Sequence, residues 1–286
     1  HKIWYAMFMT SERPKPYVGI SGVISSEQQS FYGDIFRDCG LEDAGRRLAL
    51  GIKAVHKTQF LDVENKYGRA WYPVGETAFR GAVEQSPDSQ RMINIAQVYL
   101  DIEHVGDADY RNSFTKRIFH RGEEWLNGIQ FDILPWHSDK DIAPFLEQLK
   151  ESHPDQLVLL QCHGEAMGQL GPKEAIRQLG AVASSIDYVL FDASHGTGTR
   201  LDVAKLQSYL DEGYESDSLS NIGLAVAGGL NAAVIRDDLP ELLSTYPQTS
   251  WDAEGQLHPI NDKGERPLDE KVVRNYLNAS RDVLVV

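Results

Sequence analysis

The chain has 286 residues, of which 42% are hydrophobic and 24% charged, a composition typical of a globular protein with a large buried core. Its formal net charge of -14 argues against a broad surface for nucleic acid or for an anionic membrane. No run of about 18 apolar residues is present that could span a bilayer.

Only two cysteines, Cys39 and Cys162, occur in the chain, and neither lies in a CxxC motif that would suggest zinc or redox chemistry. They are too few for a disulfide framework and fit a reducing compartment, so we expect a cytoplasmic protein. We expect no cofactor, no bound metal and no nucleic-acid or membrane partner. The expected state is a monomer or a homodimer.

Short apolar runs bounded by turn residues alternate with longer segments of helical periodicity. In chain order, the predicted strands are Tyr17–Ile24, Leu48–Val55, Met92–Leu100, Gly128–Leu134, Leu157–Cys162, Tyr188–Asp192, Gly223–Ala227 and Thr249–Asp252. Helices are predicted at Ile142–Lys150, Lys173–Val182, Val203–Leu210, Ala232–Leu243 and Asp269–Arg281. The strands read as continuous apolar runs, as expected for parallel strands covered on both faces.

This alternation predicts an α/β fold, a single-domain (β/α)₈ TIM barrel over residues 1–286. The segments after the second and third strands, Lys57–Gln90 and Asp101–Asn127, are too long for plain crossovers. We predict that they are partly helical, with extended βα loops over the active-site face. A doubly wound open sheet shares the alternation, but the number of strands and the absence of a GxGxxG turn after the first strand favour the barrel.

The predicted seventh strand ends in Gly228-Gly229-Leu230-Asn231, ahead of the Ala232–Leu243 helix. Adjacent glycines let backbone N–H groups approach an anion without a Cβ in the way, and the helix N-terminus adds about half a positive charge. Barrels commonly bind phosphate at the loops after strands seven and eight. We therefore predict that Gly228, Gly229 and Asn231 bind phosphate, with Asn231 as N-cap; the alternative is a tight turn without a ligand.

The predicted sixth strand ends at Asp192, the position where barrel enzymes keep catalytic groups, so Asp192 is predicted to be catalytic. The loop that follows combines glycines with hydroxyl and guanidinium donors suited to an oxyanion. We predict that it binds phosphate through Gly196, Thr197, Gly198, Thr199 and Arg200. The alternative for its later half is a surface loop in which Asp202 caps the next helix.

These two strand ends resemble those of phosphoribosylanthranilate isomerase, a (β/α)₈ barrel of tryptophan biosynthesis. In that family the sixth strand ends in Leu-Leu-Asp before a loop rich in Gly and Thr, to which 189–199 is similar, and the seventh strand ends in Gly-Gly-Leu-Asn, as 228–231 does. Its first strand carries Lys-Ile-Cys-Gly, whose place is taken here by Gly19-Ile20-Ser21-Gly22. The resemblance implies a phosphorylated, sugar-derived substrate and an Amadori-type aldose-to-ketose isomerisation, with Asp192 as the acid and the position of Ser21 as the catalytic site of the base.

Two positions depart from the family's pattern. A serine hydroxyl has no accessible anion near neutral pH, so Ser21 does not take over the role of the family's cysteine thiolate. The family's Ser-Ser-Gly phosphate contacts after strand eight would fall near Ala253-Glu254-Gly255, where Glu254 and the adjacent Asp252 oppose phosphate binding. We therefore expect a divergent relative with an altered base or reaction.

Several ionisable side chains end predicted strands and should converge on one mouth of a barrel: Lys53, Asp101, Asp132, Cys162, His163, Asp192 and Asp252. His163 titrates near neutral pH and is our predicted base, with Cys162 as the alternative. Lys53 is predicted to contact phosphate or to pair with a carboxylate; a Schiff-base lysine of an aldolase or lyase is a second hypothesis. A third is a barrel that binds a phosphorylated ligand without catalysis.

Overall fold

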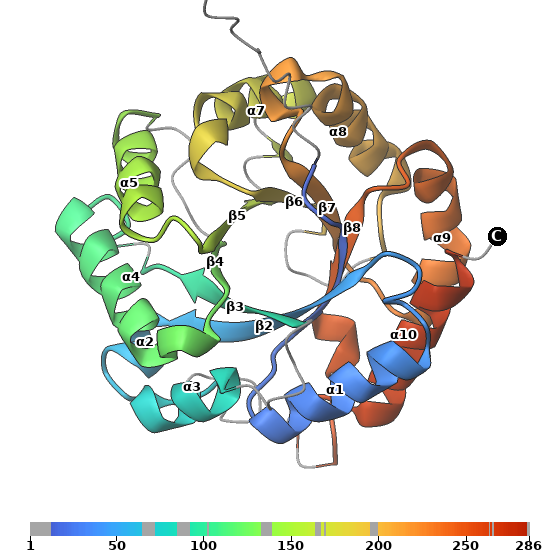
Figure 1. Ribbon diagram of the computed structural model, residues 1–286, viewed down its shortest axis with the longest axis horizontal. Helices are drawn as coiled ribbons and strands as arrows, with labels where there is room; N and C mark the ends of the chain where they lie inside the picture. Colours follow the sequence, from blue (N-terminus) through green and yellow to red (C-terminus); the bar gives the residue numbers. More distant parts are fainter. Residues whose placement is uncertain are drawn as a thin grey trace, which may run out of the picture.

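The computed structural model describes residues 13–64, 72–84, 92–101, 103–132, 139–163, 167–168, 170–194, 200–262, 264 and 266–284. Over these ranges the chain forms a closed barrel of parallel strands, in which each strand pairs with the next along the chain and the last pairs with the first. Helices surround the barrel (Figure 1). The predicted TIM barrel is confirmed, and the open-sheet alternative is wrong.

The strands are β1 (Tyr17–Ser21), β2 (Arg47–Val55), β3 (Met92–Tyr99), β4 (Gly128–Phe131), β5 (Leu157–His163), β6 (Tyr188–Asp192), β7 (Gly223–Ala227) and β8 (Ser250–Ala253). The α-helices are α1 (Ser26–Asp38), α2 (His56–Gln59), α3 (Gly75–Val83), α4 (Ala108–Gly122), α5 (Asp139–Ser152), α7 (Gly171–Ala181), α8 (Val203–Glu215), α9 (Ala232–Thr245) and α10 (Glu270–Asp282). Every predicted strand and helix is present, and the long segments after β2 and β3 are partly helical as predicted.

The predicted first strand is too long at its C-terminal end. The backbone N–H groups of Gly22 and Val23 both donate to the carbonyl oxygen of Gly51, at 2.9 and 3.1 Å, and this turns the chain away from the barrel after Ser21. The predicted fourth strand also runs past β4, but its last two residues lie outside the described ranges.

Side-chain caps fix where several helices begin. The Asp202 carboxylate accepts the Lys205 backbone N–H at 3.0 Å, so Asp202 caps α8, as the alternative interpretation of this loop expected. Asp269 caps α10 in the same way through the N–H of Val272, at 2.9 Å. Because each cap stands at the end of a βα loop, it sets where the chain leaves the mouth of the barrel.

Successive residues of each strand point alternately to the helices and into the barrel. On β6, Phe191 packs in the layer between barrel and helices, whereas Tyr188 and Leu190 fill the interior. At the N-terminal ends of the strands the interior is apolar, and Tyr17 packs edge-on against Tyr188 with ring centroids 5.3 Å apart. Polar side chains gather toward the opposite end, where the βα loops begin.

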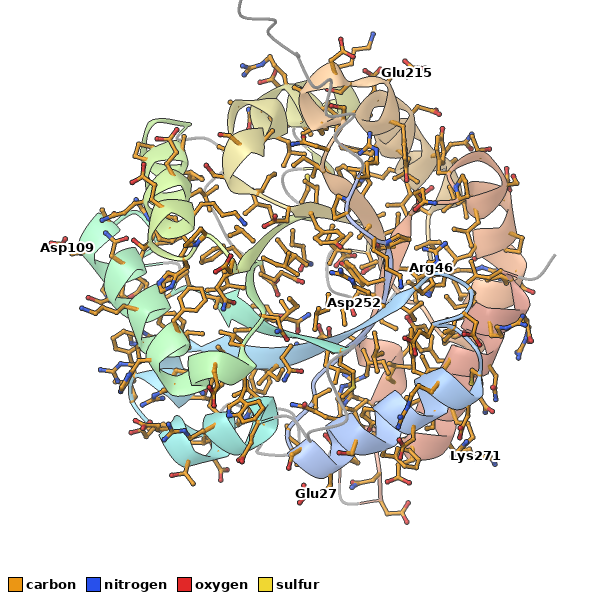
Figure 2. All side chains as sticks on the ribbon, viewed as in Figure 1. Glu27, Arg46, Asp109, Glu215, Asp252 and Lys271 are labelled. Carbon is orange, nitrogen blue, oxygen red and sulfur yellow. The ribbon has the colours of Figure 1, made fainter. Side chains whose placement is uncertain are left out.

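Two glycines make room for polar side chains inside the barrel. A Cβ at Gly19 on β1 would overlap the Asp252 carboxylate from β8, and a Cβ at Gly51 on β2 would overlap Ser21 and Gln97. In Figure 2, Asp252 lies near the centre of the barrel, while other labelled charged residues such as Glu27 and Lys271 lie at the outside. The absence of a side chain at these glycines is therefore what allows a carboxylate so deep in the fold.

Candidate active site

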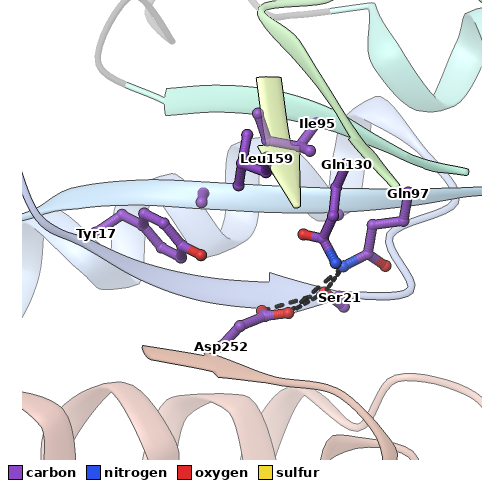
Figure 3. A pocket seen from close by; sticks show the side chains of 9 residues that line it. Tyr17, Ser21, Ile95, Gln97, Gln130, Leu159 and Asp252 are labelled. Atoms are coloured by element: carbon purple, nitrogen blue, oxygen red, sulfur yellow. Dashed lines mark hydrogen bonds between the residues drawn. The ribbon is translucent and has the colours of Figure 1, made fainter. Parts of the chain in front are cut away.

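The deepest part of the candidate site is a small cavity inside the barrel, about the size of one water molecule. Figure 3 shows Ser21, Gln97 and Asp252 pointing toward one another at this cavity. The Ser21 hydroxyl donates to Asp252 Oδ2 at 2.8 Å, and Gln97 Nε2 donates to Ser21 Oγ at 2.5 Å. Gln97 Nε2 also lies 3.4 Å from Asp252 Oδ2. Ser21 and Gln97 thus hold the carboxylate in one orientation.

Burial raises the pKa of Asp252 to about 7, against the opposing effect of the Ser21 hydrogen bond. The negative charges of Glu254 and Asp132 raise it further, and the Lys53 ammonium lowers it. A carboxyl group with a pKa near neutrality can take up and release a proton under physiological conditions. Asp252 and Glu254, the two carboxylates predicted near the end of the eighth strand, therefore interact electrostatically with each other and with Lys53.

Lys53 lies inside the barrel mouth with an exposed fraction of 2%. Its Nζ forms an ion pair with Glu254 and donates to the Tyr99 hydroxyl at 3.1 Å. Burial lowers the pKa of Lys53, but Glu254, Tyr72 and Asp132 together more than offset this, and the pKa lies above its ordinary value. The predicted pairing of Lys53 with a carboxylate is confirmed, and the protonated amine argues against a Schiff-base role.

Asp132 follows β4 and is a second buried carboxyl group with a raised pKa. Burial raises its pKa to about 7, while hydrogen bonds from Tyr99 and Gln130 and the charge of Lys53 act in the opposite direction. Gln130 Nε2 donates to Asp132 Oδ1 at 2.7 Å and lies 3.0 Å from Gln161 Oε1. A continuous hydrogen-bonded chain therefore runs from Lys53 through Tyr99, Asp132 and Gln130 to β5.

Asp192 stands at the other end of this chain, on β6. Its Oδ2 accepts from Gln161 Nε2 at 3.2 Å, and its Oδ1 accepts the backbone N–H and the hydroxyl of Ser194 at 2.9 and 2.7 Å. The side chain is oriented by three donors and is 6% exposed. The structure thus places Asp192 at the interior mouth of the barrel, where the sequence predicted it.

The turn after β7 adjoins Asp192 directly. Gly228 and Gly229 have φ values of +114° and +61°, a conformation that favours glycine. A Cβ at Gly228 would lie only 3.0 Å from Asp192 Oδ1. Asn231 accepts the N–H groups of Ala233 and Val234 at 2.9 and 3.0 Å, which confirms its predicted role as the N-cap of α9. The predicted acid and the predicted phosphate turn are neighbours in space.

Of the predicted phosphate loop, the structure describes Arg200. Gly196, Thr197, Gly198 and Thr199 fall outside the described residues. Arg200 is exposed and forms two hydrogen bonds with Asp238 of α9, at 2.6 and 2.9 Å, with a third contact to Asp237 at 3.5 Å. These acidic residues hold the guanidinium at the surface, so the structure does not bring Arg200 together with Asp192.

The structure argues against Cys162 as the catalytic base, because its side chain faces the helices and not the interior of the barrel. It is completely buried in the layer between the barrel and the helices. Burial raises the pKa of its thiol to about 12, so no thiolate is available as a base. The backbone of His163 pairs in register with Asp192, but its side chain lies outside the described part of the structure.

Sequence reasoning missed the polar residues that link the strands: Gln97, Tyr99, Gln130 and Gln161. The sequence contains a pattern that could have identified these residues. Three consecutive strands end in a glutamine followed two residues later by another polar side chain, at 97 and 99, 130 and 132, and 161 and 163. Residues two apart share a face of a strand, so the repeat predicts which side chains face inward.

The acidic segment after β3 has a local explanation. Asp101 Oδ1 accepts the N–H of Glu103 at 3.0 Å, and Asp107 Oδ1 accepts the N–H of Asp109 at 2.8 Å.

Among the described residues, no group of three or more His, Cys, Asp or Glu side chains is placed to hold a metal ion. Nor does any helix in that part of the chain have the length and apolar character needed to cross a membrane.

No protein-family model matches the chain, and no curated protein matches its sequence. Among solved structures, it is similar to tryptophan synthase subunit alpha from Legionella pneumophila, with 12% identity and a TM-score of 0.54 over 94% of this chain and 93% of that one. The catalytic domain of a chitinase from Pyrococcus furiosus gives 10% identity and a TM-score of 0.54, over 94% and 97%.

A ribulose-1,5-bisphosphate carboxylase/oxygenase from Pyrococcus horikoshii gives 12% identity and a TM-score of 0.53, with 95% of this chain covering 58% of that chain. This chain therefore spans little more than half the length of that relative. At such identities the likeness concerns the TIM-barrel fold. The three structures carry the names of enzymes with unrelated reactions, so the comparison selects no reaction for this chain.

Proposed function

We propose that the chain is an acid–base isomerase that converts a small phosphorylated aldose derivative into its ketose isomer at the C-terminal mouth of the barrel. The reaction would be of the kind catalysed by phosphoribosylanthranilate isomerase, which the ends of β6 and β7 resemble. One observation carries the proposal: the Asp192 carboxylate adjoins the Gly228 turn, so the proposed acid and the proposed phosphate-binding turn are neighbours.

The turn would bind the phosphate group of the substrate. Gly228 and Gly229 present backbone atoms without side chains, and α9 begins directly behind them with its N-terminal positive potential. Since the chain as a whole is acidic, a local positive potential of this kind is what a phosphorylated substrate needs.

Asp192 would supply the acid. In the proposed reaction it donates a proton to the ring oxygen of the sugar while the ring opens. Ser194 and Gln161 fix its two oxygens, so the group is oriented before the substrate arrives. His163, which neighbours Asp192 through the β5–β6 pairing, is the base proposed from the sequence.

The test uses N-(5-phosphoribosyl)anthranilate and other phosphorylated 1-aminoaldoses as probes, with product formation followed by NMR. The wild type should convert at least one probe, and Asp192→Asn should lose at least about 100-fold in kcat because it removes the acid. Asp192→Asn should bind inorganic phosphate at least as tightly as the wild type, since the turn is intact and a negative charge beside it is removed. Asp43→Asn, an exposed residue in the turn before β2, is the matched control.

A fully active Asp192→Asn variant would rule out this assignment. Thermal stabilisation of the wild type by phosphate, without turnover of any probe, would instead identify a binding protein. A substrate adduct trapped on Lys53 by borohydride would indicate a lyase.

A further inference from the structure

We infer that Asp252 is the proton acceptor of the isomerisation and that it works from the opposite side of the β7 turn to Asp192. The inference rests on the proposed function and adds to it a residue that the resemblance does not supply. Ser21 and Gln97 act as positioning residues for Asp252.

The strand register links the two carboxylates through a single residue of β7. Asp192 of β6 pairs with Ala227 of β7, and Ala227 pairs with Asp252 of β8. Asp192 and Asp252 are therefore separated by two strand spacings, roughly 10 Å between their backbones. Ala227, the residue of β7 between them in this register, directs its methyl group into the barrel.

The same register ties both carboxylates to the phosphate turn. Ala227 is followed directly by Gly228 and Gly229. A phosphate bound to this turn would direct the rest of the substrate over Ala227, with Asp192 on one side and Asp252 on the other. The acid and the base of the isomerisation must reach different atoms of one substrate. Two carboxylates on either side of the turn that binds the phosphate would meet this requirement.

Asp252 is also built to be a base. It is partly accessible, lines the interior cavity and is held by Ser21 and Gln97. Its pKa of about 7 lets it take a proton at neutral pH and release it again. The ionisable groups that act on it from the surrounding elements are Tyr17 of β1, Lys53 of β2, Asp132 after β4, Glu254 after β8 and Tyr276 of α10.

After the ring opens, the substrate has a protonated imine between C1 and nitrogen. The Asp252 carboxylate takes the proton from C2; the electrons of the C2–H bond form a C1=C2 double bond, and those of the C1=N bond move to nitrogen. The resulting enolamine takes a proton at C1, Asp252 returns to the carboxylate by supplying it, and the C2 hydroxyl loses its proton to solvent as the ketone forms.

The first experiment compares Asp252→Ala with Asp252→Asn on the probe that the wild type converts. Both should lose about 100-fold or more in kcat, because the base is gone. Added formate should raise the kcat of Asp252→Ala by at least about tenfold, because a small carboxylate fits the space that the side chain has left. It should not raise the kcat of Asp252→Asn, because the amide fills that space. Near-normal kcat in Asp252→Ala, or a loss that formate does not restore in a correctly folded variant, would overturn the inference.

His163→Gln is the competing variant. If it abolishes turnover while Asp252→Ala retains it, His163 is the base and the inference is wrong. If Asp252→Ala loses turnover with formate rescue and His163→Gln keeps a measurable kcat, Asp252 is the base. Ser21→Ala should lower kcat less than Asp252→Ala does and shift the pH profile, because it removes one hydrogen bond to the base and not the base itself.

A second experiment separates failure of this inference from failure of the proposed function, since it needs no turnover. Sulfate does not titrate between pH 6 and pH 8, so its affinity for the turn reports the charges nearby. The wild type should bind sulfate roughly tenfold more weakly at pH 8 than at pH 6, because Asp252 becomes ionised. In Asp252→Ala most of the difference in sulfate affinity between pH 6 and pH 8 should disappear, whereas in Asp132→Asn most of it should remain. An unchanged pH dependence of sulfate binding in Asp252→Ala would overturn the inference.

Discussion

Asp132 and Asp252 are two carboxyl groups whose acidity is changed by the fold. Both lie inside the barrel, and burial raises the pKa of each to about 7. In the unfolded chain each returns to its ordinary value near 3.8. The folded protein therefore holds more protons than the unfolded chain between about pH 4 and pH 7. Its free energy of unfolding must fall as the pH rises through this window and level off above it.

Asp132→Asn should make this pH dependence weaker, because an amide does not titrate. Between pH 8 and pH 6 the wild type should gain about 1 kcal/mol of stability more than the variant does. Urea unfolding at pH 6, 7 and 8 measures the difference, with Asp43→Asn as an exposed control. Equal pH dependence in wild type and Asp132→Asn would mean that Asp132 is ionised throughout.

At the scale of elements, the connection from β7 to α9 combines a tight turn, an N-cap and close contact with β6. Gly228 has a φ of +114° and leaves no room for a side chain beside Asp192 and Ser194. Asn231 then starts α9. The whole connection is specified by four consecutive residues, which explains why its local form could be predicted.

Gly228→Ala should be destabilised by about 1–3 kcal/mol and should bind phosphate much more weakly. The added methyl group meets both backbone strain and the Asp192 carboxylate, with 3.0 Å to Oδ1. Gly45→Ala is a suitable control, since Gly45 has a φ of +79° and nothing within 4 Å of the added Cβ. Calorimetry and phosphate titration of both variants would test this, and equal effects at the two sites would show that the contact with Asp192 is unimportant.

At the scale of the whole molecule, the barrel is closed by contacts between the two ends of the chain. The Tyr17 N–H donates to Ser250 Oγ at 3.0 Å, and the Tyr276 hydroxyl donates to the Gly19 carbonyl oxygen at 2.9 Å. Arg46, 3% exposed, donates to the carbonyl oxygens of Thr249 and Pro247 at 2.6 and 2.7 Å. These contacts join β1 and the residue before β2 to α10, to β8 and to the segment that leads into β8, so they form only when the entire barrel does.

Arg46→Ala should cost about 2–4 kcal/mol of unfolding free energy, because it leaves two carbonyl groups without these donors and removes the packing of the guanidinium over Trp251. Arg236→Ala, which breaks an exposed pair with Asp282, should cost less than about 1 kcal/mol. Urea unfolding of the two variants checks both values. Similar costs would mean that the seam between the chain ends contributes little.

The sequence by itself determined the features that depend on neighbours along the chain. Strands and helices follow from apolar periodicity, the caps from single polar residues, and the turn at Gly228 from adjacent glycines. The fold followed from their alternation, since eight βα units close into a barrel. The position of Asp192 at the mouth could be predicted because the strand ends of a barrel meet there, whichever residues occupy them.

Only the tertiary structure decided which strand-end groups act together. Cys162 and Gln161 are adjacent in sequence, yet one faces the helices and the other contacts Asp192. Ser21 meets Asp252 across 231 positions of the chain, and Lys53 meets Glu254 across 201. Closure of the barrel and the register of its strands bring these groups together. No local pattern contains that information, because each partner lies at the far end of a different strand.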